Sequence, residues 1–135
     1  MGAGDLAAFR EAGRALFSLG LVKGSEGNLS TWDGERLLIT RTGCELAALS
    51  EGDVLEGTVD EPPAAASSDL SRHLAIYRAN GRGAVAHAHP PGSVPEGWVQ
   101  GQEHGSYAFG DTLEAAVAGI VRSARRAARR GDGAP

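Results

Sequence analysis

One stretch, Ala84 to Pro90, constrains the fold more than any other. Its small and β-branched residues predict a short buried strand, and Pro90 marks the end because proline donates no ladder hydrogen bond. Side chains alternate across a strand, so His87 and His89 leave the same face. Two neutral imidazoles held in this way can share one divalent metal with a third ligand from elsewhere. Two ordinary histidines at a strand end are the alternative, and this motif alone does not decide between them.

The length and composition of the chain predict one globular domain, residues 1–135. The sequence is 41% hydrophobic and 22% charged, as in ordinary globular proteins. A net charge of −4 gives no reason to expect binding to nucleic acid. The single cysteine, Cys44, excludes an internal disulfide framework and fits a reducing cytosol. No apolar run reaches membrane-spanning length and no export signal is recognisable, so we expect a cytoplasmic protein without a membrane contact.

Apolar residues at helical spacing predict three helices. The first follows Asp5, its expected N-cap, and carries an apolar stripe from Leu6 to Phe17. The second opens at residues 67–69, and the third opens at Asp111, where an acidic residue three positions later suggests a capping box. These helices need a sheet or one another to cover their apolar faces.

Strand signals lie between the helices. Asp33-Gly34 separates the apolar segments 29–32 and 36–40, which predicts a hairpin with a two-residue turn. Further strands are expected at 53–59 and 104–110. Together with the strand that ends at Pro90, they predict an α/β fold with helices on the faces of a sheet.

Three segments carry groups suited to binding an anion. Residues 24–30 combine glycines with polar side chains, and residues 40–43 combine hydroxyls with a cation and a glycine. Ser67 and Ser68 open a helix, where free N–H groups and the helix dipole favour phosphate. Each segment also has a plainer interpretation, as a turn, a loop or a helix cap.

Two titratable residues belong to the second helix. Asp69 lies at its start, where the dipole stabilises a carboxylate that could act as a ligand or a base. His73 shares the apolar face with Leu74 and Tyr77, so we predict a hydrogen-bonded core histidine rather than a metal ligand.

With these motifs in order, the chain resembles the class II aldolase/adducin family, which includes fuculose-phosphate aldolase and ribulose-phosphate 4-epimerase. The resemblance runs from the first helix to the last. The matching motifs are Gly27-Asn28-Leu29-Ser30, Leu38-Ile39-Thr40-Arg41-Thr42-Gly43, Ser67-Ser68-Asp69 with His73 and Tyr77, Ala84 to Pro90, and His104-Gly105 with Gly110, Leu113, Glu114 and Ala115.

The resemblance implies a fold and an activity. The fold would be a shortened three-layer α/β/α structure with a largely antiparallel central sheet. The activity would be that of a metal-dependent aldolase-type lyase, which cleaves a C–C bond of a small phosphorylated sugar through an enediolate. A sugar-phosphate 4-epimerase of the same family and a catalytically degenerate metal-binding or assembly domain are the alternatives. The resemblance also implies a homo-oligomer, a tetramer in this family, with sites between subunits.

The same resemblance implies a role for individual residues. His87, His89 and His104 would bind one divalent metal, with zinc expected, and Asp69 would act as the catalytic acid/base or lie at the metal. The residues expected to hold the substrate phosphate are Asn28, Thr42, Gly43, Ser67 and Ser68.

The sequence departs from the family pattern in two places. Only residues 91–103 separate the second and third ligand segments, where the family has a longer stretch with catalytic residues. The family's C-terminal extension, which can supply a catalytic tyrosine, has no counterpart. These departures favour the degenerate alternative, whereas the retained histidines favour an enzyme.

Overall fold

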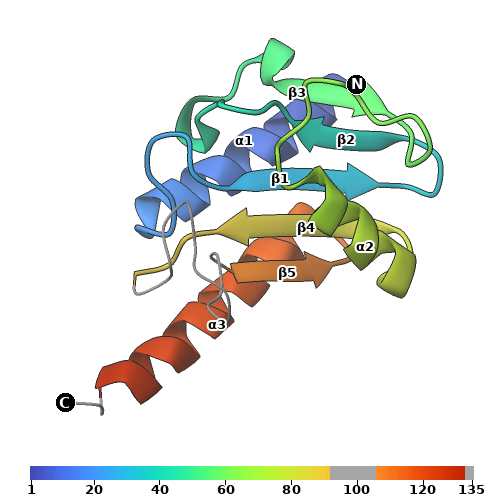
Figure 1. The fold of residues 1–135 in the computed structure, drawn as a ribbon. Helices are drawn as coiled ribbons and strands as arrows, with labels where there is room; N and C mark the ends of the chain where they lie inside the picture. Colours follow the sequence, from blue (N-terminus) through green and yellow to red (C-terminus); the bar gives the residue numbers. More distant parts are fainter. Residues whose placement is uncertain (92–105, 133–135) are drawn as a thin grey trace.

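The computed structural model describes residues 1–91 and 106–132, and they form a sheet with helices on both faces (Figure 1). The sheet has five antiparallel strands in the order β3-β2-β1-β4-β5. The strands are β1 Asn28–Trp32, β2 Leu37–Thr40, β3 Val54–Gly57, β4 Gly83–Ala88 and β5 Ser106–Gly110. The α/β fold class and the antiparallel sheet are therefore confirmed.

The helices make two layers around the sheet. α1 and α3 cover one face, and α2 covers the other (Figure 1). The helices are α1 Ala3–Ser18, α2 Leu70–Asn80 and α3 Leu113–Asp132, with 3-10 turns η1 Leu46–Ala48 and η2 Glu51–Asp53 between β2 and β3. No helix in the described parts of the chain is long and apolar enough to cross a bilayer.

The central strand β4 shows why two layers form. Ala84, Ala86 and Ala88 are fully buried against the α1 and α3 layer, where small side chains let the helices approach closely. Val85 points to the opposite face and packs with Tyr77 of α2. Because side chains alternate along a strand, His87 lies on the α2 face as well. The strand predicted from the sequence is thus confirmed, and its alternation decides which layer the histidine meets.

Helix and turn boundaries differ from the predictions in detail. α1 begins earlier than expected, with Gly2 at the N-cap, and Asp5 instead accepts a hydrogen bond of 3.0 Å from the Gly2 N–H. Thr112, rather than Asp111, caps α3, because its Oγ1 accepts a hydrogen bond from the N–H of Ala115. Asp5 and Asp111 both lie near a helix start, where side chains at more than one position can accept hydrogen bonds from the free backbone N–H groups.

The β1–β2 hairpin has a longer connection than its sequence signal predicts. Trp32 pairs with Leu37, so four residues connect the strands instead of two. Asp33 accepts hydrogen bonds from the backbone N–H groups of Glu35 and Arg36, at 2.9 and 2.7 Å. These bonds hold the pKa of Asp33 below its usual value. The side chain of Asp33 thus stabilises the wider turn.

Candidate functional site

A cavity of about 180 Å³ opens at the end of the sheet where β1 begins and β4 ends. The residues that line it are Ser25, Gly27, Asn28, Arg41, Thr42, Gly43, Ser67, Ser68, Asp69 and His89. All five residues expected to hold phosphate are in this set, together with the expected acid/base and one expected metal ligand. Segments far apart in the sequence therefore converge on one small, mostly polar cavity.

Backbone hydrogen bonds pin two of these segments together. The Ser67 N–H donates to the Thr40 carbonyl at 3.1 Å, and the Thr42 N–H donates to the Ala65 carbonyl at 2.9 Å. The stretch before α2 is therefore held against the stretch after β2. This pairing brings the hydroxyls of Thr42, Ser67 and Ser68 into one wall of the cavity.

A glycine allows the opposite wall to close. Gly27 has φ of +81°, and a Cβ built there would lie 2.8 Å from the His87 carbonyl oxygen and 2.8 Å from Val22 Cγ1. Beyond it, Asn28 pairs directly with His87 across the β1–β4 ladder. A residue with a side chain would push these strands apart, so glycine is required both by conformation and by space.

Asp69 is located at the N-cap position of α2, and its own N–H donates to Ser67 Oγ at 3.2 Å. Its Oδ2 accepts a hydrogen bond of 2.8 Å from Asn28 Nδ2 and lies 3.5 Å from His87 Nε2. Asn28, expected only as a phosphate ligand, thus also holds the carboxylate. No sequence pattern indicated this second role, because the two residues belong to different elements.

The two histidines of the β4 segment lie side by side. Their ring centroids are 4.9 Å apart, which agrees with their expected position on one face. The His87 ring is fully buried and stacks on Tyr107, and its Nδ1 lies 3.2 Å from the Ser106 carbonyl. A carbonyl only accepts, so Nδ1 donates and Nε2 carries the lone pair in the neutral ring. Histidines that bind metals through Nε2 typically donate their Nδ1–H to a carbonyl or carboxylate oxygen, which fixes the tautomer in the same way.

The predicted third ligand, His104, lies outside the described residues. Within residues 1–91 and 106–132, no group of three or more His, Cys, Asp or Glu side chains could hold a metal ion. The three-histidine centre therefore stays a prediction.

His73 has the buried, hydrogen-bonded position expected from its place on the apolar face. Its ring is fully buried, with Nδ1 2.6 Å from Ser30 Oγ and Nε2 hydrogen-bonded to Asn28 Oδ1. Burial lowers the pKa of His73 to about 3, with a smaller contribution in the same direction from His87. The ring is thus neutral at physiological pH.

Arg41 is a cavity residue that the set of expected phosphate ligands omitted. Its guanidinium donates to Asp53 Oδ1 at 2.5 Å, and Ser50 donates to Asp53 Oδ2 through both its N–H and its hydroxyl. The Ser50 backbone N–H, followed by the Arg41 contact, keeps the pKa of Asp53 below its usual value. A charged carboxylate therefore holds Arg41, the one cation among the described residues that line the cavity. The sequence had indicated Arg41 as the cation of a possible anion-binding segment, residues 40–43, but the family resemblance did not assign it to the phosphate.

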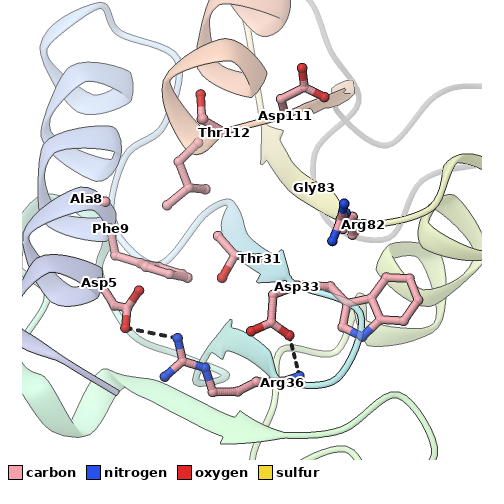
Figure 2. A pocket seen from close by; sticks show the side chains of 12 residues that line it. Asp5, Ala8, Phe9, Thr31, Asp33, Arg36, Arg82, Gly83, Asp111 and Thr112 are labelled. Carbon is pink, nitrogen blue, oxygen red and sulfur yellow. Dashed lines mark hydrogen bonds and ion pairs between the residues drawn. The ribbon is translucent and has the colours of Figure 1, made fainter.

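A second, larger cavity of about 530 Å³ lies where β1 ends, far along the strand from the first (Figure 2). Two of its charged side chains, those of Asp5 and Arg36, form an ion pair. Figure 2 shows the Arg36 guanidinium reaching Asp5, a contact of 3.2 Å between two half-exposed side chains. Among the described residues that line this cavity, none was expected to be functional.

The fold and the smaller cavity together define an α/β/α protein of the class II aldolase type. Residues 7–97 match the family described as Class II Aldolase and Adducin N-terminal domain, and the chain belongs to this family.

Individual relatives agree with this assignment. A 5-methylthioribulose-1-phosphate/5-deoxyribulose-1-phosphate aldolase from Rhodospirillum rubrum is 37% identical over 88 residues, which are 62% of this chain and 40% of that protein. The crystal structure of L-fuculose-1-phosphate aldolase from Thermus thermophilus is 40% identical, with a TM-score of 0.61 over 67% of this chain and 49% of that one. YgbL from Escherichia coli shares the fold, with a TM-score of 0.73 over 90% of this chain and 86% of its own at 21% identity. The matched part of the chain spans 40–52% of the length of four curated relatives and 15% of a fifth.

Proposed function

We propose that this chain carries the phosphate-binding and metal-binding part of an aldolase-type lyase that cleaves a C–C bond of a small phosphorylated sugar. The observation that carries the proposal is the 180 Å³ cavity, which gathers the expected phosphate ligands beside Asp69 and His89. A phosphate group and a short sugar chain fit a polar cavity of this size. The family and the sugar-phosphate aldolases among its relatives support the same reaction class.

The residues at the cavity fit a divalent metal. Two donor atoms on one tetrahedral zinc, each about 2.0–2.1 Å away, lie about 3.4 Å from one another. The separation of 3.5 Å between His87 Nε2 and Asp69 Oδ2 agrees with that value. His87, His89 and His104 would hold the ion, with Asp69 beside it. When bound, the ion would supply Lewis-acid stabilisation of the negative charge that develops on the substrate oxygens.

The remaining chemistry belongs to the chain's own residues. Thr42, Ser67 and Ser68 offer hydroxyl donors to the phosphate, and Arg41 offers a positive charge at the same wall. The Asp69 carboxylate, held by Asn28, is the group placed to accept or return a proton. Its orientation is fixed from the β1 side, so a substrate bound in the cavity meets it in one geometry.

The proposal includes self-association, because the family resemblance places such sites between subunits. Light scattering of the purified chain at tens of micromolar tests this part. A monomeric mass would contradict shared sites.

Metal analysis and an aldehyde-release assay test the reaction. L-fuculose 1-phosphate and 5-methylthioribulose 1-phosphate, taken from the names of the relatives, are the first substrates to test. We expect cleavage to require a divalent ion and to be lost in Asp69→Asn, whereas Asp60→Asn, an exposed residue outside the cavity, should keep full activity. Epimerised product without aldehyde would favour the 4-epimerase. Metal binding without turnover of any sugar phosphate would favour the degenerate domain.

His104 has its own test. His104→Ala should lower metal affinity by more than about tenfold after dialysis against a mild chelator, because two histidines on one strand form only a weak chelate. Full metal content in this variant would contradict the three-histidine centre.

A further inference from the structure

A buried chain of hydrogen bonds runs from α2 to the cavity. Tyr77 OH lies 2.7 Å from Ser30 Oγ, which lies 2.6 Å from His73 Nδ1. His73 Nε2 contacts Asn28 Oδ1, and Asn28 Nδ2 reaches Asp69 Oδ2 at 2.8 Å. Ser30 and His73 are fully buried, Tyr77 is 1% exposed and Asn28 is 4% exposed. Solvent therefore does not compete for these bonds along most of the chain.

The carboxylate at one end determines the direction of every bond. A charged carboxylate only accepts, so the Asn28 amide turns its NH₂ group to Asp69 and its carbonyl oxygen to His73. That oxygen requires a donor, which makes His73 the tautomer with hydrogen on Nε2. Its Nδ1 then accepts from the Ser30 hydroxyl. Because serine has one hydroxyl hydrogen, Ser30 in turn accepts from Tyr77.

We infer that Tyr77, Ser30 and His73 act as positioning residues that lock the Asn28 amide with its NH₂ group toward the anion-binding cavity. The inference rests on the proposed phosphate site and deepens it. Asn28 lines the cavity, and its amide nitrogen carries two hydrogens. One hydrogen binds Asp69, and the other is available to a bound phosphate.

The orientation of the Asn28 amide matters because its two ends are chemically opposite, a carbonyl oxygen that accepts and an NH₂ group that donates. A flipped Asn28 would place a carbonyl oxygen against both the Asp69 carboxylate and a phosphate, and both contacts would be repulsive. His73 opposes the flip as long as it carries hydrogen on Nε2, because that N–H would then face the amide NH₂ group, which is also a donor. The low pKa of His73 supports this arrangement, because a neutral ring keeps Nδ1 as an acceptor for Ser30.

The first test measures the tautomer of His73 directly. A two-bond ¹⁵N–¹H correlation spectrum of the imidazole rings at pH 7, assigned by the signals missing from His73→Gln, should show hydrogen on Nε2 of His73. Hydrogen on Nδ1 would overturn the inference, because Asn28 would then have to turn its amide the other way. This result does not depend on bound metal, on phosphate or on activity.

The second test measures affinity for inorganic phosphate by calorimetry. His73→Leu leaves the Asn28 oxygen without a buried donor, so we expect affinity to fall by about tenfold or more. His73→Gln can donate to Asn28 and accept from Ser30, and should keep affinity within about threefold of wild type. Leu74→Ala is the matched control: it alters the neighbouring residue of the same helix, 8% exposed, and should leave phosphate affinity within about twofold while lowering stability.

The outcomes separate the inference from the proposed function. Wild-type phosphate affinity in folded His73→Leu overturns the inference alone. A parallel loss of affinity in Leu74→Ala also overturns it, because affinity would then follow stability and not the hydrogen-bond chain. Failure of the wild-type protein to bind phosphate overturns the proposed site and, with it, the role of His73 there. If His73→Leu does not fold, the tautomer measurement and His73→Gln decide.

Discussion

Replacing Gly27 with alanine should destabilise the fold in two ways, through the backbone conformation and through a steric clash of the new Cβ. Gly27 has φ of +81°, a conformation that costs an L-residue roughly 1–2 kcal/mol. The new Cβ would also lie 2.8 Å from the His87 carbonyl oxygen, which belongs to the β4 backbone and has little freedom to move. Overpacking of this kind typically costs about 1–3 kcal/mol. We therefore expect Gly27→Ala to lower the free energy of unfolding by about 2–5 kcal/mol.

Gly24 in the same loop provides the control. Its φ of +55° is also positive, but a Cβ there would meet nothing within 4 Å. Gly24→Ala should show only the conformational cost, roughly 1–2 kcal/mol. Urea denaturation followed by circular dichroism gives both values. Equal destabilisation by the two substitutions would refute the reasoning, because the close approach to His87 would then contribute nothing.

Other parts of the molecule carry three further predictions. Gly13→Ala should destabilise the protein by about 1–3 kcal/mol although alanine favours helices, because the new Cβ would lie 2.0 Å from the Leu46 carbonyl oxygen. A Cβ at Gly4 in the same helix would meet open space, so Gly4→Ala should be neutral or stabilising by up to about 1 kcal/mol. Thermal and urea denaturation measure both variants. The pKa of His73 is about 3 in the folded protein, and that of a free histidine is 6.5. Between pH 3 and pH 6.5, His73 is therefore protonated in the unfolded chain but not in the folded one. The free energy of unfolding should thus fall as pH drops through this window, by up to about 1.4 kcal/mol per unit, and His73→Gln should show a smaller slope; equal slopes would contradict the assignment. Arg41→Gln should weaken binding of inorganic phosphate on the order of tenfold in calorimetry. Arg10→Gln, on the exposed face of α1, should leave phosphate affinity unchanged. Equal phosphate affinities in the two variants would show that Arg41 is not part of the site.

Local patterns predicted the elements of this fold well where one short segment contains its own signal. The strand before Pro90 and the helix after Asp69 show their alternation and spacing in a few residues, so both could be placed from the sequence. The caps of α1 and α3 were misplaced by three residues and by one. In α1 the expected cap Asp5 lies inside the first turn and accepts from the Gly2 N–H, and in α3 Thr112 caps in place of its neighbour Asp111. The hairpin turn widened because Asp33 bonds to two N–H groups further along, which a dipeptide signal does not register.

The contacts between the residues of the site could not be predicted from the sequence, for a different reason. Asn28 and Asp69 meet only because α2 packs on the face of the sheet to which Asn28 of β1 points, and Arg41 is held by Asp53 across a loop. Such contacts depend on how elements pack, and no spacing within one segment encodes them. The family resemblance indicated which residues belong to the site, but not that Asn28 contacts Asp69 and His73 at once.

The pairing of β1 with β4 couples the two halves of the proposed site. Asn28, which faces Asp69 and the phosphate wall, is the direct cross-strand partner of His87, an expected metal ligand. Gly27 lets those strands approach, and the buried chain through His73 fixes the amide at the junction. A change that separates β1 from β4 should therefore weaken phosphate binding and metal binding together. Gly27→Ala offers this comparison: a loss of one affinity without the other would mean that the two halves are positioned independently.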